Sequence, residues 1–454
     1  MQRTSSGYAA SVIVTAIVVA IIFFFIGYYS HSPTTTPGTT TITFYESLAP
    51  AEQAYFTNVL IPEFEAQYPN ISVQFVNLPS GQPPSTIATL VQANKVGASI
   101  VGLDNLAVGE DLFPGYLMNL SSIVSNMMPS TLISSAANMV SYEKQVFNGV
   151  YFIPFRSNIP LVFYNKTAFT NAGITTPPAT DTQLLTDAQT IYTKTGVKAV
   201  MFQGAANTGG HSGASTGTEL YQWMVQDGGN PFVFNDTGDI QAFEFLYNLS
   251  AYFTPGYTGG YWGSYKGLAT GVYDYLDYQW PYVYGILTNG TYNMNNNNLG
   301  VYGGPSGTSN DNHLLGGDVL VIPKGATDIP ALETFAKFLL SPTAQKQTLV
   351  QLSWVAINSQ AYQNLPSNTS VVGAALNQSI SGGVFLRDPT PWISQWNVYA
   401  SDAFTQIIVD HASYSQIPSI LSSYNAQMYS YIASNYNSSV ANKYEAGYYK
   451  PISI

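Results

Sequence analysis

The sequence contains no cysteine. This absence excludes disulfides, thiolate catalysis and zinc–thiolate sites. Histidine is also rare. The four histidines, His31, His211, His313 and His411, are scattered without the spacing of metal ligands. We therefore expect neither a metal site nor a cofactor.

Charged residues are equally scarce. They make up 9% of the chain, against roughly 25% in an ordinary globular protein. The 25 acidic residues outnumber the 14 lysines and arginines, giving a net charge of −11, and no basic tract occurs. Nucleic acid is therefore excluded as a partner. An apolar content of 46% with 14% aromatic residues excludes a disordered chain.

The shortage of charge has two interpretations. Near pH 4 most carboxylates become neutral. The cations left unopposed would then be only the 14 lysines and arginines plus the 4 histidines, so self-repulsion in acid stays limited. This interpretation predicts a protein that faces an acidic exterior. The alternative is a low-charge extracellular protein in a neutral medium.

The N-terminus predicts an anchor or a signal. Residues 8–29 carry no charge and are long enough to span a bilayer as a helix. Arg3 is the only charge before them, which weakly supports a positive-inside orientation. No Ala-x-Ala site follows, although a pilin-like signal cut after Gly7 is an alternative. Residues 1–30 are thus a signal or transmembrane anchor and 31–41 a Thr/Pro tether, which places the following domain outside the cell.

Nine Asn-x-Ser/Thr sequons occur, where composition alone would give about six. The excess is mild support for glycosylation. The candidate positions are Asn70, Asn119, Asn165, Asn235, Asn248, Asn289, Asn368, Asn377 and Asn437.

Alternating apolar residues predict strands at 41–47, 71–77 and 99–105, with a helix around 56–64 that Pro62 kinks or restarts. Strands that alternate with helices predict an α/β fold with a helix-covered parallel sheet. Ligands of such sheets bind beyond the C-terminal strand ends. Glu46, Asp104 and Asn105 would lie there.

A second set of elements begins with the strand pattern at 160–166. The helical pattern at 330–340 ends at Ser341-Pro342, which predicts the N-cap and first residue of a further helix. Residues 428–449 predict a C-terminal helix that then frays. With 454 residues, the chain is too long for one hydrophobic core and fits two domains.

Four segments resemble, in order, the extracellular solute-binding proteins of ABC importers, in the carbohydrate class related to maltose-binding protein. "VFYNKTAFTNAGITTPP" matches the Tyr-Asn-Lys, Ala-Gly-Ile and proline-led helix that follow a hinge strand in that family. "FEAQYPNISVQF" and "FNGVYFIPF" resemble the turn before its second strand and the approach to its first hinge. "GGDVLVIPKGATDIPALETFAKFLLSPTAQ" resembles its second crossing.

The resemblance implies two α/β lobes with a sugar bound in the cleft between them. Lobe 1 would comprise 42–157 and 312–362, and lobe 2 would comprise 158–311 and 363–454. The implied function is a sugar receptor that delivers a mono- or oligosaccharide to an ABC permease by cleft closure. The N-terminus resembles the pilin-like signals of some archaeal, membrane-tethered binding proteins.

The stretch "VYDYLDYQWPYVYG", residues 272–285, holds five tyrosines and a tryptophan. Such rings fill a core or form a platform for a flat ligand. The family usually has Gly-x-Trp here, and Tyr278 replaces the glycine. The resemblance implies Trp280 as the ring that stacks on sugar, with Tyr278 and Gln279 beside it. Tyr273, Tyr275, Tyr282 and Tyr284 are expected to be mostly core.

Position in the family implies further ligand candidates. Two of these candidates have an alternative role without ligand contact: His211 as an exposed loop residue, and Asp318 as a cap or a brace of the hinge. Trp223 shares a helical face with Leu220 and Met224, so we expect it in the core. The candidates are Asn207 and His211 in a Gly-rich loop, Trp396 and Tyr399 in a helix, and Asp318 after Gly316-Gly317.

Two enzyme classes and a surface protein are the alternatives. Gly213–Gly217 matches Gly-x-Ser-x-Gly, and Asp410-His411 follows, but a serine hydrolase needs a strand directly before that turn. A glycosidase needs two carboxylates facing one bond, and Glu46, Asp104 and Asp318 are available. Low charge and a tether also fit a surface-layer or adhesive carbohydrate-binding protein.

Overall fold

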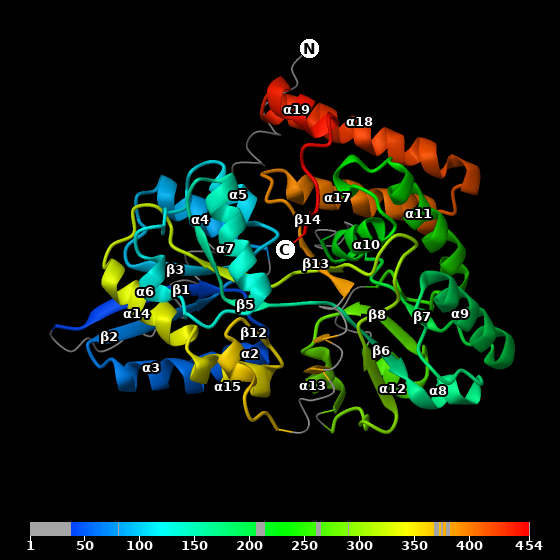
Figure 1. Cartoon of the computed structure of the whole chain (residues 1–454), viewed down its shortest axis with the longest axis horizontal. Coiled ribbons are helices and arrows are strands. Elements are labelled where there is room, and N and C mark those ends of the chain that lie inside the picture. The colour runs from blue at the N-terminus through cyan, green and yellow to red at the C-terminus, as the bar shows by residue number, and fades with distance from the viewer. Residues whose placement is uncertain are drawn as a thin grey trace, which may run out of the picture.

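The computed structural model describes residues 38–79, 81–205, 214–259, 265–288, 290–366, 372–373, 376–377 and 382–453. The chain forms two α/β lobes, seen side by side in Figure 1, each with its own sheet and covering helices. Within the described ranges no helix is long and apolar enough to cross a membrane. The apolar segment 8–29 lies outside them.

The first lobe is built on a five-stranded sheet of order β2-β1-β3-β11-β4. Strands β1, β2 and β3 are parallel, as the sequence pattern predicts. Strand β11 enters antiparallel between β3 and β4, so the sheet is mixed rather than wholly parallel. The strands are β1 (Thr40–Glu46), β2 (Ile71–Asn77), β3 (Ser99–Asp104), β4 (Phe152–Pro154) and β11 (Asp318–Val321).

Helices cover both faces of this sheet. The predicted kink at Pro62 is a π-helical turn, η1 (Phe56–Leu60), between α2 and α3. In a π turn the backbone hydrogen bonds shift by one residue, so the helix continues although Pro62 has no N–H to donate. Ser341 caps α15 by accepting from the N–H of Ala344, as predicted. The helices are α2 (Pro50–Tyr55), α3 (Ile61–Gln67), α4 (Pro83–Gln92), α5 (Val108–Leu112), α6 (Val124–Met127), α7 (Ser134–Val146), α14 (Ile329–Leu339) and α15 (Pro342–Leu352).

The second lobe is built on a four-stranded sheet of order β7-β8-β6-β9, in which β6 runs antiparallel to both neighbours. Its strands are β6 (Leu161–Asn165), β7 (Val200–Met201), β8 (Tyr275–Gln279) and β9 (Leu299–Tyr302). Its helices are α8 (Lys166–Asn171), α9 (Asp181–Thr195), α10 (Ala214–Gln226), α11 (Thr237–Leu249), α12 (Tyr265–Thr270), α13 (Val283–Thr288), α17 (Ile393–Phe404), α18 (Ile417–Asn435) and α19 (Ser438–Glu445), with short helices η2 (Pro231–Val233), η3 (Ser250–Tyr252), η6 (Thr405–Val409) and η7 (Tyr414–Gln416).

The chain passes between the sheets after β4, after β9 and after β12. Short strands brace these crossings: β5 (Arg156–Ser157) pairs with β12 (Val355–Ala356), ahead of the short helix η4 (Ser359–Tyr362). Strand β13 (Val384–Leu386) pairs with β10 (His313–Leu314) and β14 (Ile452–Ser453). The C-terminus therefore returns as a strand between the lobes (Figure 1), and the expectation that it frays is wrong.

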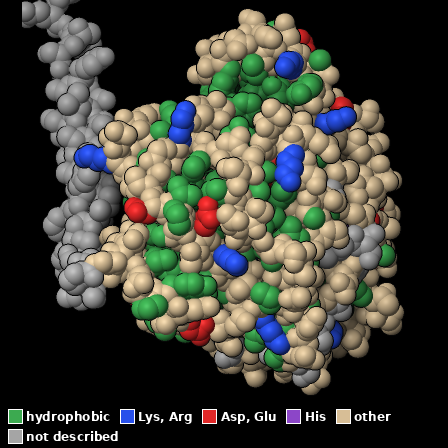
Figure 2. All heavy atoms as spheres, turned by 60° about the vertical axis from the view of Figure 1, so that its left-hand side comes forward, with side chains coloured by type: hydrophobic (Ala, Val, Ile, Leu, Met, Phe, Trp, Pro, Cys, Tyr) green, Lys and Arg blue, Asp and Glu red, His purple; other side chains and the backbone are tan. Residues whose placement is uncertain are grey.

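Each lobe has one apolar core. The core of the first lobe includes Phe44, Phe56 and Trp354, and that of the second includes Trp223, Trp396 and Phe404. A third apolar cluster contains residues of both sheets, such as Val101 and Leu276. The surface is poor in charge, as the composition requires. Figure 2 shows the face that turns the first lobe forward, on which blue and red side chains stand isolated among hydrophobic and uncharged ones.

Candidate functional site

A cavity of about 170 Å³ lies where the two lobes and the crossing segments meet. The end of β3, the start of α2 and the start of β11 supply its first-lobe wall, and α10 with the β8–α13 loop supply the opposite wall. The crossing segments form the floor. Its lining residues are Ala49, Glu52, Asp104, Arg156, Asn158, Thr218, Trp280, Tyr282, Gly316, Gly317, Asp318 and Arg387.

Two adjacent glycines let the second crossing come close to the first. Gly317 has a φ of +111°, and a Cβ there would lie 2.2 Å from the carbonyl oxygen of Arg156. A Cβ on Gly316 would lie 2.8 Å from Cη2 of Trp280. The N–H of Asn158 donates to Gly316 at 3.0 Å, and the N–H of Gly316 donates to Asn158 at 2.7 Å. The floor is therefore bare backbone, with the Trp280 indole edge resting on it.

One guanidinium in the wall is held by two carboxylates. Arg156 Nε donates to Asp318 and Nη1 donates to Glu52 Oε1 at 3.3 Å. Burial raises the pKa of Asp318, while Arg156 opposes that shift. Although burial lowers the pKa of Arg156, Asp318 and Glu52 raise it by more, so this side chain stays charged.

Glu46 lies behind this ion pair. Its side chain is buried, and its Oε2 has no hydrogen-bond partner among the described residues. Burial and then the charge of Asp318 raise its pKa well above the ordinary range. Glu46 therefore belongs to the same electrostatic cluster without lining the cavity.

The second guanidinium connects the two lobes. Arg387 donates from Nη1 to Thr218 Oγ1 of α10 at 2.9 Å and from Nη2 to Asn105 Oδ1, after β3, at 3.4 Å. Asp104 Oδ1 lies 3.8 Å from Nη2. Asn105 is buried and donates to the Leu315 carbonyl at 3.0 Å. The third crossing thus fastens the end of β3 to the start of α10.

The structure brings three of the predicted ligand residues to the cavity: Asp104, Asp318 and Trp280. Their contact with a ligand stays a prediction. Asp318 also braces the crossing, the alternative role considered for it. Asn105 stands behind the wall through its bonds to Arg387 and Leu315. Asn207 and His211 lie outside the described residues.

Tyr278, Gln279 and Trp396 were expected at the cleft, and the structure places them elsewhere. Trp396 is fully buried, stacks on Phe234 at 5.5 Å and donates to the Pro231 carbonyl at 2.8 Å. Gln279 is buried and donates to the Asp277 carbonyl. Both side chains are thus occupied inside the second lobe.

Tyr278 is buried with a φ of +46°, the left-handed region that favours glycine. The position at which the resembled family carries glycine therefore keeps a glycine-like backbone, although a tyrosine occupies it. Tyr399, another expected cleft residue, is half-buried against Tyr424 at a ring distance of 6.0 Å and does not line the cavity.

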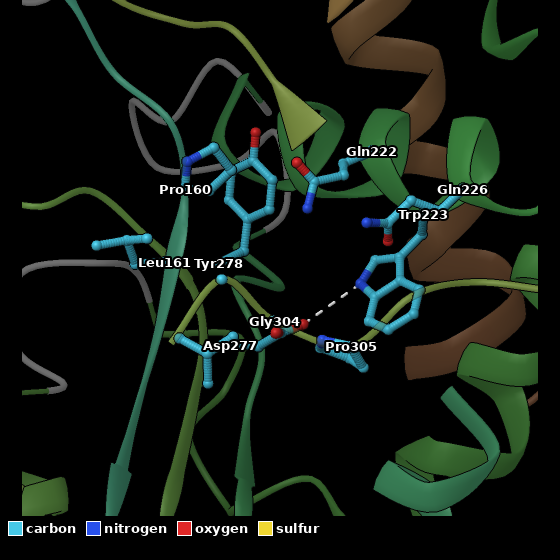
Figure 3. A pocket seen from close by; sticks show the side chains of 11 residues that line it. Pro160, Leu161, Gln222, Trp223, Gln226, Asp277, Tyr278, Gly304 and Pro305 are labelled. Atoms are coloured by element: carbon cyan, nitrogen blue, oxygen red, sulfur yellow. Dashed lines mark hydrogen bonds between the residues drawn. The ribbon is translucent and has the colours of Figure 1, made fainter. Parts of the chain in front are cut away.

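Tyr278 points instead toward a second, water-sized cavity of about 10 Å³. Figure 3 shows this cavity between the β6–β8 sheet and α10, with Trp223 Nε1 donating to Asp277 Oδ2 at 3.3 Å. Trp223 is buried, as predicted. Such a space holds one water molecule at most, so it is no ligand site.

The residues missed from the sequence are Glu52, Arg156, Asn158, Thr218 and Arg387, and Tyr282 was expected in the core. The rarity of arginine was a signal in the sequence that could have identified Arg156 and Arg387. The chain has only three, Arg3, Arg156 and Arg387, and the two within the described ranges both line the cavity. No group of three His, Cys, Asp or Glu in the described part of the chain could hold a metal.

Solved structures of sugar-binding proteins share this fold. The GacH receptor of Streptomyces glaucescens, solved without ligand and with acarbose, is 20% identical over 86% of this chain and 98% of its own, with a TM-score of 0.72. Maltose-bound MalE3 of T. maritima is 16% identical over 86% and 100%, with a TM-score of 0.71. The sugar-binding protein MalE of Xanthomonas citri is 16% identical over 90% and 99%, with a TM-score of 0.71.

These likenesses establish the two-lobed fold. No curated protein matches the sequence. A family model does: residues 49–346 match the one described as bacterial extracellular solute-binding protein. That range is more than half of the chain and contains every strand of the two main sheets except β1, together with most of the cavity wall. The chain therefore belongs to the extracellular solute-binding proteins.

Proposed function

We propose that the protein is an extracellular sugar receptor that binds a mono- or oligosaccharide in the 170 Å³ cavity and delivers it to the permease of an ABC importer. The observation that carries the proposal is the cavity wall, where the half-buried Trp280 stands among two guanidinium–carboxylate pairs. A sugar ring offers C–H groups to an aromatic ring and hydroxyls that both donate and accept.

Closure of the lobes around the ligand follows from the same geometry. The wall comes from both lobes, so only a closed form contacts the ligand from both sides. We take lobe 1 as 42–157 with 312–362 and lobe 2 as 158–311 with 363–454. Solved relatives of the same fold include complexes with acarbose and maltose, which supports a sugar as ligand.

The hydrolase alternatives have no support. The family consists of solute-binding proteins. Of the carboxylates considered for a glycosidase, Glu46 is buried behind the wall, and Asp318 is ion-paired to Arg156. Neither is free to face a glycosidic bond.

We further propose that residues 1–30 tether the protein to the membrane, by helix insertion or in the pilin-like archaeal manner, with 31–41 as a flexible spacer. Among the described sequons, Asn70, Asn119, Asn248, Asn377 and Asn437 are exposed and are the better glycosylation candidates. Asn165 and Asn235 are half-buried, and Asn289 and Asn368 lie outside the described residues.

A thermal-shift and calorimetric screen of mono-, di- and trisaccharides tests the sugar proposal. At least one sugar should raise the melting temperature and release or absorb heat with a 1:1 stoichiometry. Chromogenic glycosides should not be cleaved. A complete absence of sugar binding, or turnover of any glycoside, would overturn the proposal.

A further inference from the structure

We infer that the cavity takes one neutral sugar ring and that Asp104 is the residue that excludes acidic sugars. This inference rests on the proposed function and names the ligand class within it. It is carried by the pairing of charges in the cavity wall and by the size of the cavity.

Arg387 is a buried cation whose charge is only weakly neutralised by its neighbours. Its side chain is 4% exposed, and its hydrogen bonds go to the neutral acceptors of Thr218 and Asn105. Its Nε has no partner within the described ranges. The nearest carboxylate is Asp104, whose Oδ1 is 3.8 Å from Nη2. Without Asp104, this guanidinium would be an unneutralised buried charge that favours an anionic ligand.

Asp104 removes that preference. Its side chain is 59% exposed, and it lines the cavity beside Arg387. A ligand carboxylate directed at Arg387 would therefore approach Asp104 as a like charge. Rejection of a competing ligand by a repulsive group is an established route to specificity.

The other end of the wall offers no free cation either. Arg156 is shared between Asp318 and Glu52. With all groups ionised, the lining carries three carboxylates and two guanidiniums. A neutral sugar suits this pattern, because one hydroxyl can donate to Asp104 while its neighbour accepts from Arg387.

The size of the cavity indicates a single ring. Its volume is about 170 Å³, and a protein cavity of about 150 Å³ holds benzene. A hexose has twice as many heavy atoms as benzene, so one sugar ring already fills this cavity. A disaccharide has two such rings and would need the lobes to stand further apart. The cavity, with the lobes as they stand here, therefore fits one monosaccharide unit.

Calorimetry on the full chain tests the inference with neutral aldoses (glucose, galactose, mannose, xylose, arabinose), the uronates of glucose and galactose, maltose and maltotriose, at a pH where the uronates are ionised. At least one aldose should bind, at least tenfold more tightly than either uronate and than maltose. Asp104→Asn should shift the aldose-to-uronate affinity ratio at least tenfold toward the uronate. Asp410→Asn removes the same charge from an exposed site on the second lobe and should leave the ratio unchanged.

Each contrary result has its own meaning. A uronate that binds as tightly as the aldoses, or an unchanged ratio in Asp104→Asn, overturns the role of Asp104. Tight maltose or maltotriose binding with weak aldose binding overturns the single-ring inference and leaves the sugar receptor standing. Binding of no sugar at all overturns the proposed function itself.

Discussion

The guanidinium of Arg156 lies over the indole of Trp354, with its central carbon 4.1 Å from the ring centroid. The same indole donates from Nε1 to Glu52 Oε1 at 2.6 Å, and Glu52 in turn accepts from Arg156. Glu52 also accepts the N–H of Ala49 at 2.9 Å, which caps α2. Ring, carboxylate and helix start therefore fix the guanidinium before any ligand arrives, which lowers the entropy cost of binding.

Replacing Arg156 by glutamine should leave Asp318 and Glu52 uncompensated. Breaking a buried ion pair from one side costs about 3–5 kcal/mol, so we expect a loss of that order in the free energy of unfolding and at least a tenfold loss of sugar affinity. The destabilisation should shrink in acid, because Asp318, whose pKa burial raises, then becomes neutral. Urea unfolding at pH 4 and pH 7 measures the loss of stability and its pH dependence, and calorimetry measures the loss of affinity. Trp354→Phe is the control and should destabilise the protein less. Equal destabilisation at both pH values would contradict this account.

Trp280→Ala should weaken sugar binding by about 2 kcal/mol, as for a central aromatic anchor, and Trp280→Phe should lose less. The ring is half-buried at the cavity, so the melting temperature without ligand should change little. The buried Trp223 is the matched control, since alanine there should cost about 3–5 kcal/mol of folding stability. A large drop in the melting temperature of Trp280→Ala with unchanged affinity would mean that Trp280 belongs to the core.

The two glycines of the floor should respond differently to alanine. Gly317→Ala forces a Cβ into the Arg156 carbonyl at a φ of +111°, so we expect it to lower the melting temperature. In Gly316→Ala the new Cβ meets mainly the edge of the Trp280 ring, at 2.8 Å, and reaches the Asn158 carbonyl oxygen only at 3.4 Å. The ring can shift, so this variant should lower affinity more than stability. Thermal melts and calorimetry on the pair check this. A stable Gly317→Ala variant with full affinity would show that the close approach of the crossings is dispensable.

Stability should be greatest in acid. Burial raises the pKa of Glu143 and that of Asp111 to about 8, whereas in the unfolded chain such groups titrate near pH 4. Between these values the folded state holds more protons than the unfolded state, so the free energy of unfolding falls as the pH rises from about 4 to 8 and levels off above. The melting temperature should follow that course.

Glu143→Gln is the control for this pH dependence. Glu143 accepts the N–H groups of Tyr151 and Phe152, and glutamine can keep those bonds without titrating. The variant should show a shallower decline from pH 4 to 8. A melting temperature that rises over this range in the wild-type chain would contradict both the buried protonated carboxyls and the acid-exterior interpretation.

Patterns within short stretches of the sequence predicted individual strands and helix starts well. The alternation at Ile42 and Phe44 gives β1, and Ser341-Pro342 begins α15. The antiparallel insertion of β11 was not predictable from alternation, because its pairing partner β3 lies some two hundred residues away in the sequence. The assembly of the cavity from both lobes is non-local in the same way.

The aromatic residues expected to bind the ligand also show that packing between distant parts of the chain could not be predicted from local sequence patterns. Trp280 and Trp396 both stand among polar and aromatic neighbours in the sequence, yet one lines the cavity and the other is sealed against Phe234. Tertiary packing alone separates them. The two arginines of the cavity were the opposite case. The rarity of arginine was visible in the sequence, whereas the partners of Arg156, Glu52 and Asp318, were not.

The central claim is that a sugar closes the lobes over this cavity. The chain has no cysteine, so two introduced ones are uniquely labelled. Gly285 of α13 faces Ser353 at the end of α15, where a Cβ on Gly285 would lie 3.8 Å from Ser353 Oγ. Spin labels at Gly285→Cys and the exposed Gln351→Cys therefore report on the separation of the lobes. The account predicts a distance that shortens and narrows when a sugar identified by calorimetry is added, and identical distances with and without that bound sugar would contradict it.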